Sequence, residues 1–491
     1  MASIFQAFPL LRTAAPRLTR QLFVCKPCLK TPVRSAVRPS RPSPPQRSVL
    51  QSVRWQSTQA AVHAETPATA AKDTIRKSTF PETSDKSVAY WLLGSAASVF
   101  GIVIFGGLTR LTESGLSITE WRPVTGSLPP TSQSDWESEF SKYRASPEFQ
   151  LLNPNMTLPE FKQIYWMEWT HRLWGRVIGL TFLFPTAYFI ARRKVSASMA
   201  VKLTGICALI GFQGVIGWWM VASGLKDDLF APGSHPRVSQ YRLTAHLGAA
   251  FAVYISMLLS GLSILRERRF LASPESALSH LNALKHPHLR LFRGSVVALC
   301  GLVFITAMSG ALVAGLDAGL IYNEFPYMGV GLTPPKKELF DPFYSHTEDQ
   351  SDLWWRNMLE NPSLVQLDHR ILATTTFTAI MSLFAYTRLS PKVKVKMPKD
   401  AKKGMAGLVH VVWMQAALGI STLIYMVPTW LASAHQGGAM ALLTMAVVLY
   451  SRIRMPRKAI MQSLAKRAPQ TNQIPLKSRL GDVNAAKEKA L

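Results

Sequence analysis

The chain has 491 residues, of which 48% are hydrophobic, and its formal net charge at pH 7 is +27. A charge of this size is typical of nucleic-acid-binding proteins, but here the basic residues gather in the N-terminal segment and beside long apolar runs. This distribution argues against nucleic acid as a partner. The apolar runs exclude a simple set of soluble domains and predict a protein of the lipid bilayer.

The N-terminal segment, residues 1–64, contains ten Lys or Arg, no Asp or Glu, and many Ser and Pro. A basic start without acidic residues is typical of a mitochondrial transit peptide. We therefore expect residues 1–56 to be a transit peptide, with cleavage near Arg54-Trp55-Gln56-Ser57. The CxxC motif formed by Cys25 and Cys28 lies inside this segment, so we assign it no redox or metal role.

Eight apolar windows have about the 20 residues that a transmembrane helix needs. They cover residues 88–110, 166–190, 202–223, 242–265, 294–315, 364–387, 405–427 and 432–451. Clusters of Arg and Lys follow the second, fourth, sixth and eighth windows. Basic residues stay on the cytoplasmic or matrix side of a membrane. With a mitochondrial transit peptide, this predicts a multi-pass protein of the mitochondrial inner membrane with both termini in the matrix.

The connections between these windows differ in charge. Residues 111–165 and 316–363 are long and comparatively acidic, so we expect them to face the intermembrane space. Residues 266–293 form a predicted matrix linker, and residues 453–491 form a predicted basic matrix tail.

The two halves of this pattern resemble each other. Matching positions include Gly106-Gly107-Leu108 with Gly310-Ala311-Leu312, Gln213 and Gly217 with Gln415 and Gly419, and His171-Arg172 with His369-Arg370. Because each half has four spans, the two repeats share one orientation. The predicted fold is an all-α membrane protein with eight transmembrane helices. It consists of two tandem four-helix bundles, residues 85–265 and 294–452.

Four histidines occur a few residues into spans two, four, six and eight: His171, His246, His369 and His435. A single histidine in a span is more often a hydrogen-bonded interior residue than a ligand, although its cost means that it usually has a partner. Two pairs on facing helices predict two bis-histidine metal sites, with haem as the natural occupant. Zinc is disfavoured because no Cys or carboxylate set completes a tetrahedral site in either half.

The two predicted sites differ at one position. Glu168 precedes His171 by three residues, whereas Gln366 precedes His369. Residues at i and i+3 share a helix face, so Glu168 is a candidate for proton transfer at the first site. A carboxylate that is merely hydrogen-bonded to a neighbouring helix is the alternative. Asp368 is on another face, so we expect the first half to be reactive and the second to hold a resident cofactor.

Arg172 and Arg370 directly follow two of the histidines, near the outer surface. Arginine pairs well with carboxylates, so each is a candidate to bind a haem propionate or to form a structural ion pair. The alternative is that each arginine extends to lipid phosphates. Repetition in both halves favours the first interpretation.

The segments that carry these residues resemble the haem A synthase family. The matching blocks are GGLTRLTESGLSITEWRPVTGSLPP at 106–130, WMEWTHRLWGR at 166–176, GLIYNEFPYMG at 319–329, LVQLDHR at 364–370 and AHQGG at 434–438. The resemblance covers about residues 85–455. One departure is the lack of the cysteine pair that many bacterial relatives carry in the first outer loop, so no thiol role is transferred.

This resemblance implies that the C8 methyl of haem O is oxidised to a formyl group by two successive hydroxylations. The product would be haem A for cytochrome c oxidase assembly. By the same resemblance, Glu168 is the essential carboxylate, His171 and His246 bind the substrate haem iron, and His369 and His435 bind a resident haem b. A ferredoxin-type electron donor and a neighbouring haem O synthase are the implied partners.

A bis-histidine iron has no open position for dioxygen. We therefore expect water to supply the oxygen, with Glu168 as the base and the second haem as the electron relay. Two alternatives stay open: a di-haem b-type membrane electron carrier, and a haem-delivery protein. A homo-oligomer is also open, because small-residue runs such as Gly205 to Gly217 suit helix packing within or between subunits.

Overall fold

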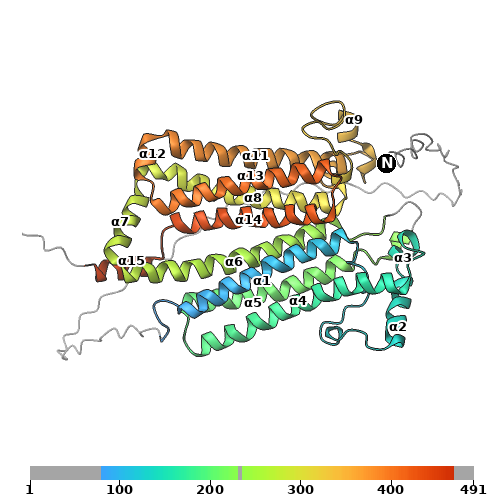
Figure 1. Cartoon of the computed structure of the whole chain (residues 1–491), viewed down its shortest axis with the longest axis horizontal. Helices are drawn as coiled ribbons and strands as arrows, with labels where there is room; N and C mark the ends of the chain where they lie inside the picture. Colours follow the sequence, from blue (N-terminus) through green and yellow to red (C-terminus); the bar gives the residue numbers. More distant parts are fainter. Residues whose placement is uncertain (1–78, 231–234, 469–491) are drawn as a thin grey trace, which may run out of the picture. The chain divides into compact units, whose positions relative to one another are not determined.

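The computed structural model describes residues 79–230 and 235–468, and the regular structure within them is helical (Figure 1). The predicted transit peptide, with Cys25 and Cys28, lies outside the described residues. So do residues 469–491 of the predicted tail. An isolated β-bridge joins Met328 and Gly331 in the second outer connection.

All eight predicted spans are helices in the structure. They are α1 (Lys86–Leu111), α4 (Leu158–Ala191), α5 (Ala197–Val221), α6 (Gln240–Ala272), α8 (Arg290–Gly315), α11 (Pro362–Leu389), α13 (Lys399–Ile424) and α14 (Thr429–Ile453). Of the helices in the described residues, seven are long and apolar enough to cross a membrane. The exception among the eight is α11: it has 28 residues, but Arg370, Arg388 and a run of threonines lower its hydropathy.

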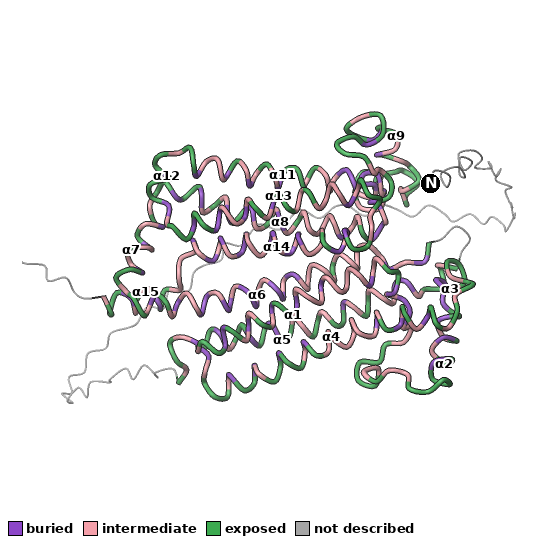
Figure 2. Tube along the Cα trace, in the orientation of Figure 1, coloured by how far each residue is buried: buried purple, intermediate pink, exposed green. Residues whose placement is uncertain are grey.

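The long helices pack as two sets of four (Figure 1). In the first set, α1 and α5 each contact α4 and α6; in the second set, α8 and α13 each contact α11 and α14. The sets meet where α6 contacts α8 and α14, and where α14 contacts α1. The apolar windows of α6 and α14 are 44% buried, against 17% for α5 and α13, so α6 and α14 are the central helices. Figure 2 shows exposed residues along the outer faces of α4 and α5.

Short helices lie at both ends of the long ones (Figure 1). The two acidic connections contain α2 (Gln133–Arg144), α3 (Pro147–Leu152), α9 (Lys336–Leu339) and α10 (Leu353–Glu360) at one end. At the other end are α7 (Pro274–Lys285), α12 (Pro391–Lys396) and α15 (Lys458–Arg467). The predicted linker thus contains the last turns of α6 followed by α7, and the described part of the predicted tail contains α15.

Candidate functional site

The four histidines share one local environment. Each imidazole ring packs against a glycine of a neighbouring helix and occupies the space that a side chain at that position would need. A Cβ built on that glycine would approach the ring Cε1 to 2.8 Å for Gly106–His171, 2.9 Å for Gly217–His246, 3.1 Å for Gly310–His369 and 2.7 Å for Gly419–His435. In a close-packed interior any larger residue would displace the ring. The glycines therefore fix all four imidazoles against a neighbouring backbone, in the same way in both helix sets.

Two glutamines support the histidines of α6 and α14. The side-chain amide of Gln213 donates to the carbonyl oxygen of His246 at 2.8 Å, and that of Gln415 donates to the carbonyl oxygen of His435 at 3.0 Å. These glutamines stand four residues before the glycines that pack on the same rings. The matching Gln and Gly positions in the two halves thus have matching contacts.

Several buried polar atoms around the histidines have no hydrogen-bond partner in the described part of the chain. They are Nδ1 of His171, Nδ1 of His435, and Oε1 of Gln213 and of Gln415. Buried polar atoms normally have partners, so these atoms are suited to a bound group. Within residues 79–230 and 235–468, no group of three His, Cys, Asp or Glu residues could hold a metal ion. Imidazoles supported by glycine backbones therefore suit haem iron better than a bare metal ion. The residues present therefore fit haem at both sets.

Glu168 is buried, with 2% of its surface exposed, and its carboxylate accepts four hydrogen bonds. The hydroxyl of Ser117 and the backbone N–H of Ile118 each lie 2.7 Å from Oε2. Nε and Nη2 of Arg172 lie 2.9 and 2.6 Å from Oε1. These donors offset the cost of burying a charge. They also hold the carboxylate one helical turn before His171.

The two arginines hold the outer connection that follows the first helix of each set. Arg172 donates to the carbonyl oxygens of Ile118 at 2.8 Å and Glu120 at 3.1 Å. Arg370 donates to those of Tyr322 at 3.0 Å and Tyr327 at 3.1 Å. Both arginines therefore connect a histidine-bearing helix to the loop above it. Nε of Arg370 is buried without a hydrogen-bond partner.

Glu168 and Gln366 make opposite hydrogen bonds with equivalent loop residues. The Glu168 carboxylate accepts from the backbone N–H of Ile118, whereas the Gln366 amide donates to the carbonyl oxygen of Tyr322 at 3.0 Å. Both residues are 2% exposed. At this position the first site thus has a buried carboxylate where the second has a buried amide.

The sequence interpretation missed a second buried carboxyl group near the first site. Glu148 on α3 is 5% exposed, and it accepts a hydrogen bond of 2.9 Å from the hydroxyl of Tyr143. Burial raises the pKa of Glu148 to about 7; the Tyr143 hydrogen bond opposes this, and the charges of Glu168 and Glu113 add to it. The sequence gives no signal for this burial, because Glu148 occurs in a polar loop segment.

Comparison with known proteins identifies the family. The model of the COX15-CtaA family, described as cytochrome oxidase assembly protein, matches residues 89–447. The chain belongs to the COX15-CtaA family. Heme A synthase COX15 of Saccharomyces cerevisiae is 48% identical over 409 residues, which are 83% of each chain. The human heme A synthase COX15 is 44% identical over 373 residues, 76% of this chain and 83% of that protein.

Another relative in this family carries an additional domain. The heme A synthase-mitochondrial ferredoxin fusion protein of Schizosaccharomyces pombe is 52% identical over 372 residues, 75% of this chain and 60% of that protein. Together these relatives confirm the family resemblance seen in the sequence blocks.

Proposed function

We propose that this protein is a haem A synthase, an oxidoreductase that converts haem O into haem A for cytochrome oxidase assembly. The main support is the likeness to heme A synthases along 83% of the chain, combined with four glycine-supported histidines and one buried carboxylate. A di-haem electron carrier or a haem-delivery protein would use the histidines equally well. Neither gives a role to a carboxylate that the second site replaces with Gln366.

The proposed architecture has eight spans in two tandem four-helix bundles, with α11 as the eighth span. Its 28 residues are sufficient to cross a bilayer, and it packs between α8 and α13. The repeat is supported by Glu113 and Asp317, which follow α1 and α8 at matching positions and both have φ of 52°. The basic and acidic connections at opposite ends support a mitochondrial inner-membrane orientation with both termini in the matrix.

At the first site His171 and His246 would hold the substrate, haem O, and at the second His369 and His435 would hold a resident haem b. Haem bound at the second site supplies an iron that carries electrons. The described residues position the histidines. The glycines hold the four imidazole rings against neighbouring helices, and Gln213 and Gln415 hold the helix turns that carry His246 and His435. Contact of Arg172 and Arg370 with haem propionates stays a prediction.

Glu168 is proposed as the proton acceptor at the first site, with water as the oxygen source. Each hydroxylation of the ring methyl by water then releases two electrons and two protons. Glu168 takes up one proton, the other passes to water, and the two electrons require an oxidised redox partner as their acceptor. The ferredoxin fused to the fission-yeast relative supports a ferredoxin-type partner. In the water route this partner would accept the electrons, whereas the sequence interpretation expected it as a donor. Isotope-labelled water tests the oxygen source in the singly hydroxylated form, because its alcohol oxygen should carry the label and, unlike a formyl oxygen, does not exchange with water.

Pigment analysis tests the proposed function. The full-length protein is produced with and without a supply of haem O, and the extracted haems are separated and weighed by mass spectrometry. We expect formyl-bearing haem A only when haem O is supplied, together with haem b. Extraction of haem b alone under both conditions would support the electron carrier or the delivery protein instead.

A further inference from the structure

Two matching contacts join the helix sets near the level of the histidines. Gly248 of α6 lies against Met308 of α8, with 3.2 Å between a Cβ built on the glycine and Sδ. Gly437 of α14 lies against Ile104 of α1, with 3.1 Å to Cδ1. Ile104 and Met308 are equivalent positions of the repeat. The last helix of each set therefore packs through a glycine on the first helix of the other set.

One residue before these glycines the two halves differ. α6 has Leu247 where α14 has Gln436, and α8 has Ala311 where α1 has Gly107. The side-chain amide of Gln436 donates to the carbonyl oxygen of Val103 on α1 at 3.0 Å. A Cβ on Gly107 would overlap this amide. Gly107 is thus the residue that makes room for Gln436, and the half without the glutamine has alanine at that position.

This contact lies between the two candidate sites. Gln436 directly follows His435, a histidine of the second site. Gly107 directly follows Gly106, whose backbone supports the ring of His171 at the first site. The hydrogen bond therefore joins the helix turn that carries one histidine to the helix turn that supports another. In an α-helix the Val103 carbonyl already accepts from the N–H of residue 107, and its second lone pair can accept from Gln436.

We propose that Gln436 is a positioning residue that couples the two histidine sites. It fixes α14 against α1 at the turn where both sites meet, so that displacement of one site is transmitted to the other. This inference rests on the proposed function, in which both sites hold haem. Coupling means that loading the first site changes a property of the second. It is therefore measured at the second site, with the first site empty and then loaded.

The experiment is a redox titration of the purified full-length protein before and after haem O is added to the first site. In the wild type, loading the first site should shift the midpoint potential of the resident haem. In Gln436→Leu, which introduces the residue of the other half, we expect at least a two-fold smaller shift with unchanged haem b content. An equal shift in the variant, or none in the wild type, would overturn the proposal.

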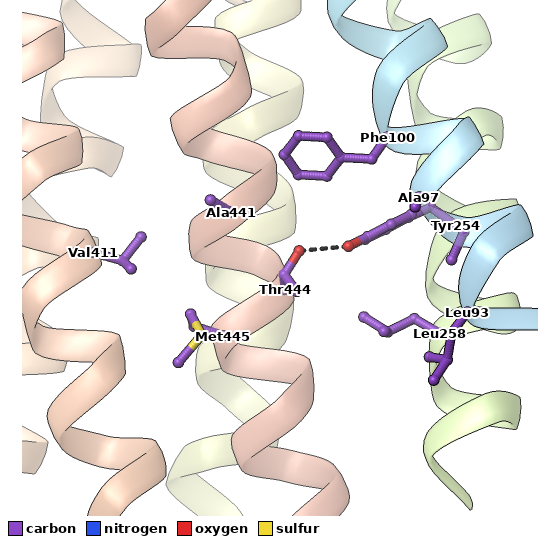
Figure 3. Close-up of a pocket in the computed structure, with 10 residues that line it drawn as sticks. Leu93, Ala97, Phe100, Tyr254, Leu258, Val411, Ala441, Thr444 and Met445 are labelled. Carbon is purple, nitrogen blue, oxygen red and sulfur yellow. Dashed lines mark hydrogen bonds between the residues drawn. The ribbon is translucent and has the colours of Figure 1, made fainter. Parts of the chain in front are cut away.

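A matched control is a second hydrogen bond between the same helix sets. The hydroxyl groups of Tyr254 on α6 and Thr444 on α14 lie 2.6 Å apart beside an apolar cavity (Figure 3). Thr444 is more than two helical turns beyond His435 on α14. Thr444→Val removes this bond and should keep the wild-type shift. A loss as large as that of Gln436→Leu would assign the coupling to general packing and contradict a specific role for Gln436.

Thermal unfolding of the same proteins separates packing from coupling. Gly107→Ala alone should lower the melting temperature, because its Cβ overlaps the Gln436 side chain. The double variant Gly107→Ala/Gln436→Leu recreates the Ala–Leu combination of the other half, so it should regain melting temperature but not the redox shift. Recovery of both would show that Gln436 only fills space. A wild-type protein without haem at either site would instead overturn the proposed function.

Discussion

Glu168 and Arg172 form an ion pair of 2.6 Å one helical turn apart on α4. Arg172 also donates to the backbone of the outer connection, so the pair joins the candidate proton acceptor to the loop above the first site. The second site has Arg370 at the equivalent position, but Gln366 replaces the carboxylate. Buried ion pairs contribute little net stability, yet removal of one partner leaves an uncompensated charge.

Arg172→Ala should therefore destabilise the protein more than Arg370→Ala. Loss of a partner from a buried pair typically costs about 3–5 kcal/mol, and Glu168 is 2% exposed. Arg370 loses only hydrogen bonds to backbone carbonyls, each worth about 1 kcal/mol. Chemical unfolding of both variants in detergent measures the difference. Equal losses would mean that the Glu168 charge does not need its partner.

Replacement of the supporting glycines should remove haem one site at a time. Gly310→Ala displaces the ring of His369 and should lower resident haem b, as His369→Ala should. Gly106→Ala should instead weaken haem binding at the first site. Optical spectra and haem-to-protein ratios measure both effects. Gly301 on α8 and Gly94 on α1 have no atom within 4 Å of a built Cβ, so their alanine variants are controls on the same helices and should keep full haem content.

Stability should fall as pH rises through the range set by Glu148. Its pKa is raised from 4.5 to about 7 in the folded protein, so between these values the folded state keeps a proton that the unfolded chain releases. The free energy of unfolding then decreases with pH across this window by about 3 kcal/mol. The melting temperature of the wild type should therefore fall between pH 5 and pH 8, and Glu148→Gln should abolish that fall. Glu348→Gln, at an exposed carboxyl group, should retain it.

The sequence predicted the positions of the long helices because the bilayer sets the length of an apolar run. It did not predict where two of them begin and end. α4 begins at Leu158, eight residues before the predicted window, because Glu160 accepts from the backbone N–H of Thr157 and caps a polar first turn. α6 continues beyond its window to Ala272. Local hydrogen bonds and polar helix turns leave no trace in hydropathy.

At the site, repetition singled out the four histidines and the matching Gln and Gly positions, but it did not predict that these glutamines and glycines contact the histidines. The ion pair of Glu168 with Arg172 could also be predicted from the sequence, because residues at i and i+4 meet on one face of a helix. The hydrogen bond of Ser117 to Glu168 and that of Gln436 to α1 were not, because they join segments 51 and 333 residues apart. Such contacts depend on how helices pack, which the repeat alone does not specify.

The product formed by Glu168→Gln tests most directly whether Glu168 is the proton acceptor. This change gives the first site the residue type of the second while leaving His171 and His246 in place. General-base loss typically reduces the rate by about 10²–10⁴-fold. The variant should therefore retain haem but accumulate haem O or its singly hydroxylated form in extracted pigment. Haem A formed at a near wild-type rate would contradict a catalytic role for Glu168, and complete loss of haem would show that its role is structural.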